Sequence, residues 1–243
     1  MMRFFHATLR TLGVEGAHAF YAAVLGRSDL DIVQLHEQAV ARGARPHWLG
    51  FLDVGDVERA AAAFAERGAI PLGPKWVNPQ GLEAAMMRDP AGALVALAKP
   101  PVTRSGDRQA ATASSSSPDI VWYELNTFDV ERAKANYAEL FGWEFAQPVD
   151  LGDLGVVHPF AWERGGAPVG SMRDIAARPG VHPHWLFHRR VASLDATMDA
   201  VRARGGIVLD PVVLPKGERI AICDDPQGAA FAIRDGAASS FSS

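Results

Sequence analysis

The chain has 243 residues, of which 48% are hydrophobic and 21% charged, and its formal net charge is −4. This composition is typical of a globular protein with a sizeable core, and it argues against nucleic acid or an acidic membrane surface as a partner. The apolar runs are too short to span a bilayer, and no signal peptide is expected at the start. The single cysteine, Cys223, excludes an intrachain disulfide and favours a reducing cytoplasm.

The first half begins with an expected strand and helix at residues 4–26. Residues 28–43 place Ile32, Leu35 and Val40 at helical spacing, which predicts a second helix. A strand that starts with the letters PHWL near residue 46 leads into another helix, and a hairpin with an Asp-Pro-x-Gly turn at 88–97 follows. Residues 100–118 contain no large apolar residue except Val102, so we expect a flexible linker.

The second half has the same order of elements. An alternating strand, VWYELNT, precedes a helix that we expect to begin at Asp129 and to end at Gly142. Two short strands should follow, then the strand PHWLFHRRV, a helix that begins at Ser193, and a hairpin at residues 218–235. The last residues, 237–243, read as a disordered tail.

The two halves therefore repeat each other. Residues 46–74 align without gaps on 183–211, residues 88–97 on 224–233, and residues 4–26 on 120–142. Trp48 and Trp185 occupy equivalent places, which favours packing of these two side chains between a sheet and a helix. One segment breaks the match, because 22 positions separate Gly26 from the next PHW tryptophan but 43 separate Gly142 from its counterpart. A repeat of this kind predicts two related modules, the first of them shortened around 27–45.

The stretches ELNTFDVERAKANYAELFGW and DDPQGAAFAI, with their counterparts in the first half, resemble the vicinal oxygen chelate (VOC) superfamily of glyoxalases, bleomycin-resistance proteins and extradiol dioxygenases. The resemblance implies an α+β fold of two tandem VOC-type modules built from βαβββ units, whose curved mixed sheets form a cleft. We expect the modules at 1–99 and 119–236, in a monomer with pseudo-twofold modules or in a homodimer.

The resemblance also implies a divalent metal held by His, Gln or Glu on early strands and by Glu on a last strand. The corresponding positions hold His6 and Trp122 on the first strands and alanine, Ala96 and Ala232, on the last. On the PHWL strands the expected position falls on Leu49 and Leu186. We therefore expect no metal or other cofactor, and a divergent divalent site would have to use His6, His182 and His184.

Three histidines in HPHWLFH, residues 182–188, project from one face if this stretch is a strand. His184 and His188 would stand about 13 Å apart along an extended strand, too far to share one ion. Because PHWL recurs in both halves, we interpret His184 and His188 as pocket-lining residues and place His182 at the exposed start of the strand.

Glu124 alternates with Trp122 and Asn126, so these three side chains share a face of their strand. If that face is concave, burial would raise the pKa of Glu124 and suit it to general acid/base catalysis. The alternative is a buried carboxylate satisfied by backbone donors or by an arginine. Trp122 and Trp162 are candidates for stacking on a flat ligand.

These residues predict a glyoxalase/bleomycin-resistance-like protein that binds a small apolar or aromatic molecule in a sheet-lined cleft without metal. The alternative is a VOC-type enzyme, a lyase, isomerase or dioxygenase-like protein, that uses Glu124 as acid/base or a divergent histidine metal site. A third possibility is a scaffold that acts through contact with another subunit. The expected partner is a small molecule rather than nucleic acid or a membrane.

Overall fold

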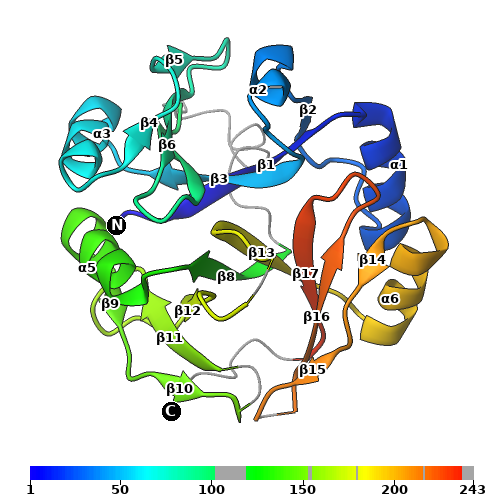
Figure 1. Cartoon of the computed structure of the whole chain (residues 1–243). Coiled ribbons are helices and arrows are strands. Elements are labelled where there is room, and N and C mark those ends of the chain that lie inside the picture. Colours follow the sequence, from blue (N-terminus) through cyan, green and yellow to red (C-terminus); the bar gives the residue numbers. More distant parts are fainter. Residues whose placement is uncertain (102–118, 153–154, 179, 216, 237–243) are drawn as a thin grey trace, which may run out of the picture.

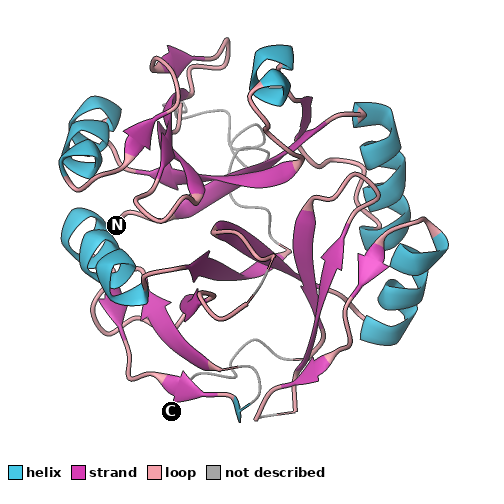
Figure 2. Cartoon of the chain, viewed as in Figure 1, coloured by secondary structure: helices cyan, strands magenta, loops and turns pink. Residues whose placement is uncertain are grey.

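The computed structural model describes residues 1–101, 119–152, 155–178, 180–215 and 217–236, so most of the expected linker and the tail lie outside the described residues. The fold is α+β, with two mixed sheets and a small number of helices (Figure 2). Within the described ranges, no helix is both long and apolar enough to cross a membrane.

Sheet A is formed by the first module, with strand order β2-β1-β3-β7-β6-β4 and with β5 paired to β6. Its strands are β1 (Phe4–Thr11), β2 (Ile32–Gln34), β3 (His47–Asp53), β4 (Ile70–Pro71), β5 (Trp76–Val77), β6 (Glu83–Arg88) and β7 (Leu94–Lys99). The helices of this module are α1 (Val14–Leu25), α2 (Glu37–Ala41) and α3 (Val57–Glu66).

Sheet B is formed by the second module, with strand order β10-β11-β12-β8-β13-β17-β16-β14, where β9 pairs with β11 and β15 with β16. Its first strands are β8 (Ile120–Thr127), β9 (Glu144–Phe145), β10 (Val149–Asp150), β11 (Val156–Ala161) and β12 (Gly170–Asp174). Its later strands are β13 (His184–Arg190), β14 (Ile207–Val208), β15 (Val212–Val213), β16 (Arg219–Asp224) and β17 (Ala230–Arg234). The helices are α5 (Val130–Phe141) and α6 (Leu194–Ala203).

The shortened segment of the first module removes one side of its sheet. In sheet B, β12 runs parallel to β8 and continues into β11 and β10. In sheet A, β2 runs parallel to β1 in the same place, and the sheet ends there. The helix predicted for 28–43 is therefore wrong at Ile32–Gln34, which form β2, and only Glu37–Ala41 are helical. The reason is that the open edge of β1 offers hydrogen bonds to a β-branched Ile-Val pair, which overrides local spacing.

The core lies between the two sheets, whose strands β1 and β3 of sheet A face β8 and β13 of sheet B (Figure 1). Phe4 of β1 packs its ring against Tyr123 and Phe187 of sheet B. Gly50 makes this approach possible, because a Cβ there would come within 2.7 Å of the Phe4 and Phe187 rings. Helix α1 lies beside α6, and α3 beside α5, at the two ends of this interface. Each sheet thus has an inner face toward the other sheet and an outer face away from it.

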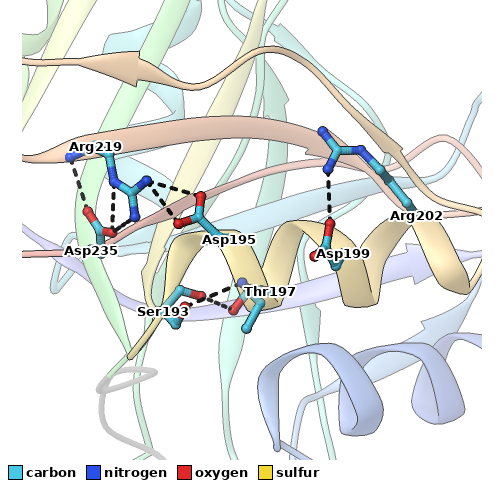
Figure 3. A network of polar contacts seen from close by, with 8 residues as sticks. Ser193, Asp195, Thr197, Asp199, Arg202, Arg219 and Asp235 are labelled. Carbon is cyan, nitrogen blue, oxygen red and sulfur yellow. Dashed lines mark hydrogen bonds and ion pairs between the residues drawn. The ribbon is translucent and has the colours of Figure 1, made fainter.

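The helix ends follow the sequence closely. The carboxylate of Asp129 accepts a hydrogen bond from the Arg132 amide at 3.0 Å, and Gly142 ends α5 in the left-handed conformation with φ 74°. The hydroxyl of Ser193 accepts from the Ala196 amide at 3.3 Å at the start of α6. Figure 3 shows how Arg219 of β16 then ties α6 to the end of sheet B, because its guanidinium donates to both Asp195 and Asp235.

The modules are connected at two places, which we call corners, where a buried tyrosine on the first helix of one module (Tyr21 or Tyr137) lies beside the Asp-Pro-x-Gly turn of the other module. Trp48 donates to the Tyr21 hydroxyl, which donates to Asp225 of the other module, both at 3.2 Å. At the opposite corner, Tyr137 of the second module lies beside Trp185 and the Asp89 carboxylate of the first. Burial, together with the neighbouring aspartate, holds the pKa of both tyrosines well above the usual range. The expected packing of Trp48 and Trp185 between sheet and helix is confirmed.

Candidate functional site

Buried polar side chains gather on the outer face of sheet B. Glu124 and Ser171 are register partners on β8 and β12, and His188 of β13 stands in register with both Trp122 and Ala232. Register partners project to the same face of a sheet, whereas Tyr123 and Leu125, which alternate with these residues, lie in the core between the sheets. The common face predicted for Trp122, Glu124 and Asn126 is therefore the outer face.

Glu124 is 5% exposed and lies beside two basic side chains. Its Oε2 atom lies 3.5 Å from Arg173 Nη2 and 3.7 Å from His188 Nε2. Burial by itself raises the pKa of this carboxyl, but Arg173, His188 and His184 outweigh burial and hold the pKa at about 2. The expectation of a raised pKa is wrong, because it counted burial without Arg173 and the two histidines beside this carboxyl. Glu124 is an ionised hydrogen-bond acceptor at neutral pH.

His188 is 2% exposed at the centre of the outer face. Burial lowers its pKa, and the nearby Glu124 carboxylate only partly opposes this effect, so the imidazole is neutral near pH 7. Within the described part of the chain, neither ring nitrogen makes a hydrogen bond of good geometry. A neutral imidazole beside a carboxylate can accept a proton from a hydroxyl, and the carboxylate then stabilises the imidazolium.

Trp122 presents a flat ring whose position is fixed on two sides. Its Nε1 donates to the Ser171 hydroxyl at 3.1 Å, and the Arg234 guanidinium lies 5.4 Å from the ring centroid. Arg234 is paired with Glu218, with 2.6 Å between Nε and Oε1. An aromatic face, two cationic side chains and two carboxylates therefore share one buried region.

Sequence reasoning missed four members of this group. Ser171, Arg173, Arg234 and Glu218 are all buried. A signal existed for Arg234, because it follows Ala232 by two residues on an otherwise apolar strand and so shares its face. Ser171 and Arg173 depended on knowing that β12 pairs with β8, which no local pattern revealed.

The remaining predicted residues lie farther from this centre. Asn126 Nδ2 and His184 Nε2 are 3.5 Å apart at the end of the face, and the Nδ1 atom of His184 lies 2.8 Å from the His182 carbonyl oxygen. His182 is exposed just before β13, as predicted. Trp162 is not part of the group, because its ring packs in the core against Phe4, Tyr123 and Trp143.

The donor set does not fit the divalent metal that the fold family implies. The residues that stand in one row across β8, β13 and β17 are Trp122, His188 and Ala232. The ligand position of β13 is therefore His188, two residues after Leu186, where the sequence had placed it. The matching row of sheet A is His6, Phe51 and Ala96. Each row offers one imidazole and no carboxylate, which is too few ligands for a metal site in proteins.

The three histidines of the alternative metal site, His6, His182 and His184, do not come together in the structure either. His6 lies against Asp31, at 2.7 Å, and close to the Thr8 hydroxyl, whereas His182 and His184 flank the start of β13. In the ranges that the structure describes, no cluster of three or more His, Cys, Asp or Glu side chains is arranged to hold a metal ion.

Comparisons with known proteins show which families and folds this chain resembles. The family model of the Glyoxalase/Bleomycin resistance protein/Dioxygenase superfamily matches residues 119–233. The matched residues are those of the second module, which is therefore similar to the domains of this superfamily.

Among curated proteins, the chain is similar to the anthracycline biosynthesis protein DauV of Streptomyces sp. (strain C5), with 33% identity over 150 residues, 61% of this chain and 51% of that protein. It is also similar to the putative glyoxylase CFP32 of Mycobacterium tuberculosis, with 27% identity over 79% of this chain and 70% of that protein. The chain thus spans about half the length of the Streptomyces relatives it matches.

Among solved structures, an extradiol ring-cleaving dioxygenase from B. fuscum superposes with a TM-score of 0.62 and 16% identity, over 99% of this chain and 73% of that one. The Mn(II)-bound glyoxalase from Novosphingobium aromaticivorans gives a TM-score of 0.59 and 12% identity, over 97% and 83% of the two chains. At this level of identity the likeness establishes the fold alone.

Proposed function

We propose that the second module binds a small aromatic molecule on the outer face of sheet B, without a metal. The observation that carries this proposal is the contrast with the equivalent positions of sheet A. Glu124, His188 and Arg234 correspond to Thr8, Phe51 and Ala98 in the aligned repeat. Burying charged groups costs stability, and the apolar cluster that β3, β6 and β7 form in sheet A indicates that this part of the fold does not need them.

The chemistry of the face favours a flat molecule with oxygen substituents. Trp122 offers a ring for stacking, which the ligand ring occupies in place of the Arg234 guanidinium. Arg173 and Arg234 suit hydroxyl or carbonyl oxygens with partial negative charge, and Glu124 accepts from a hydroxyl. The two Streptomyces relatives are named as anthracycline biosynthesis proteins, and anthracyclines are oxygenated polycyclic aromatic compounds, which supports this ligand class.

Titration of the protein with a dihydroxyanthraquinone, followed by the visible absorbance of the compound, tests the proposal. His188→Phe introduces the residue that sheet A carries at this place, so the fold should tolerate it while affinity falls about tenfold or more. His6→Ala is the matched control, because it removes a histidine from the first module and should leave affinity unchanged. Equal affinity in wild type and His188→Phe would overturn the assignment.

Metal independence needs its own experiment. The protein purified without a histidine tag should contain no stoichiometric Zn, Fe, Ni or Mn, and a chelator should not change its affinity for the dihydroxyanthraquinone. A tightly bound metal in a one-to-one ratio, whose removal abolishes binding, would contradict this part of the proposal.

The pair of His188 and Glu124 favours a second candidate function, a VOC-type lyase, isomerase or oxygenase-like enzyme. His188 would then take a proton from a ligand hydroxyl, and Glu124 would stabilise the imidazolium rather than act as the acid/base itself. Glu124→Gln should lower turnover while the ligand still binds, and it should shift the pH profile of the reaction to lower pH because the imidazolium loses its counter-charge. Unchanged turnover in Glu124→Gln would remove this residue from the mechanism.

A further inference from the structure

The two corners where the modules meet differ, although their sequences align. Each corner is built from an Asp-Pro-x-Gly turn of one module and the first helix of the other. At the corner of Tyr21, the Gln227 side chain fills the space between turn and helix. Its Nε2 donates to the Gly13 carbonyl oxygen at 3.0 Å, and its Oε1 accepts from the Leu12 backbone amide at 3.1 Å. Phe20 lies beside Tyr21 and adds a second large side chain there.

At the corner of Tyr137, the residues equivalent to Gln227 and Phe20 are Ala91 and Asn136. Both side chains are smaller, and a cavity of about 160 Å³ lies between the turn and α5. A cavity of about 150 Å³ is large enough to bind benzene. The space is therefore suited to a molecule with a single six-membered ring.

The walls of the cavity combine apolar surface with buried polar atoms. Pro90, Ala91 and Ala133 form apolar parts of the lining. Asn136 is 4% exposed, and its Nδ2 atom has no hydrogen-bond partner among the described residues. Arg67 donates to Asn136 Oδ1 at 3.3 Å, which fixes the amide so that the NH₂ group remains a donor for another molecule. A buried, unused donor in a cavity calls for an acceptor oxygen.

The charges around the cavity limit the kind of acceptor. The carboxylates of Asp89 and Asp129 belong to the lining, and Oδ1 of Asp89 already accepts from the backbone amides of its own turn. Arg132 belongs to the lining as well, so two carboxylates stand against one guanidinium, and the lining on balance opposes an anionic ligand. The carboxylate of Asp89 can accept a hydrogen bond from a hydroxyl. Phe128, which is half exposed, adds an aromatic wall at the helix start.

We propose that this cavity is a second binding site, separate from the outer face of sheet B, for a neutral single-ring phenol. The ring lies against Pro90, Ala133 and Phe128, and the phenol oxygen accepts from Asn136 and donates its proton in a hydrogen bond to Asp89. Because turn and helix come from different modules, the bound molecule bridges the two halves of the chain.

Binding of para-fluorophenol, followed by fluorine NMR on the full chain, tests the site. The wild type should bind, and Ala91→Gln should lower the affinity about tenfold or more, because it supplies the side chain that fills the other corner. Asn136→Leu removes the donor, keeps the size of the side chain and should lower the affinity as well, so it serves as the second variant if Ala91→Gln does not fold. His188→Phe is the control for the outer face and should bind para-fluorophenol as the wild type does.

Three results would overturn the proposal. One is no binding to the wild type at about 10 mM para-fluorophenol. Another is wild-type affinity in folded Ala91→Gln or Asn136→Leu. The third is a loss of binding in His188→Phe alone, which would assign the phenol to the outer face of sheet B and would leave the proposed function standing without this second site.

Discussion

The outer faces of the two sheets use one backbone arrangement for two different surfaces. In sheet A, β3 and β7 carry Leu49, Phe51, Ala96 and Ala98 on this face, and these side chains form a small apolar cluster. In sheet B, the corresponding strands and their neighbours carry buried charges, which include two arginines and two glutamates. The aligned positions of sheet A hold Thr8, Phe51 and Ala98 in place of Glu124, His188 and Arg234, which is why the proposed function assigns ligand binding to the second module.

Removal of the Glu124 carboxylate should have the largest effect on stability, because sheet A has no buried carboxylate at the aligned position. Glu124→Ala leaves the Arg173 guanidinium buried without that counter-charge, and the free energy of unfolding should fall by about 3 to 5 kcal/mol. The matched change in sheet A, Thr8→Ala, removes a neutral hydroxyl and should cost about 1 kcal/mol. Urea denaturation of both variants measures the two values. Equal losses of stability would mean that the outer faces of the two sheets do not differ in buried charge.

Acid should destabilise the second module through Glu124. The pKa of this carboxyl falls from 4.5 to about 2 on folding, so the unfolded chain binds more protons in that window. The contribution of Glu124 is therefore fully present above about pH 4.5 and is lost as the pH falls toward 2, which amounts to about 3 kcal/mol at most. Stability measured against pH should be flatter between these values in Glu124→Gln than in the wild type. If stability fell equally with pH in the wild type and in Glu124→Gln, the lowered pKa of Glu124 would be wrong.

The converse substitution places the central residue of sheet B into sheet A. Phe51→His buries an imidazole among apolar side chains without a carboxylate beside it, and it should cost about 1 to 3 kcal/mol. The variant should gain no affinity for a dihydroxyanthraquinone, because the other members of the group are absent from sheet A. Thermal or urea unfolding checks the first statement and the absorbance titration the second. A stable variant that binds the compound would mean that one histidine suffices.

The smallest expected effect concerns the two corners. Tyr21→Phe removes hydrogen bonds to Asp225 and Trp48 and should cost about 1 kcal/mol. Tyr137→Phe should cost less, because the Tyr137 hydroxyl makes no hydrogen bond of good geometry within the described chain. Paired unfolding curves decide the order, and a larger loss in Tyr137→Phe would show that this corner is the better bonded one.

Local sequence patterns predicted much of this molecule. The repeat indicated two related modules, Asp129 and Ser193 were located as helix starts, and alternation placed Trp122, Glu124 and Asn126 on one face. Local spacing failed at Ile32–Gln34, where pairing with the edge of β1 decides the conformation. It also failed at Trp162, because alternation cannot tell which face of a hairpin meets the other module.

The sequence by itself determined the order of the main elements outside residues 28–43, the missing segment of the first module and the lack of carboxylates at Ala96 and Ala232, because each of these depends on residues close in the chain. Only the tertiary structure decided that His188, rather than Leu186, shares a row with Trp122 and Ala232, since the register between β8, β13 and β17 joins strands far apart in sequence. The same holds for the pKa of Glu124, which depends on Arg173 and His188 from two other strands. Pairing register and charge proximity are long-range properties, and they place the candidate site on the outer face of sheet B.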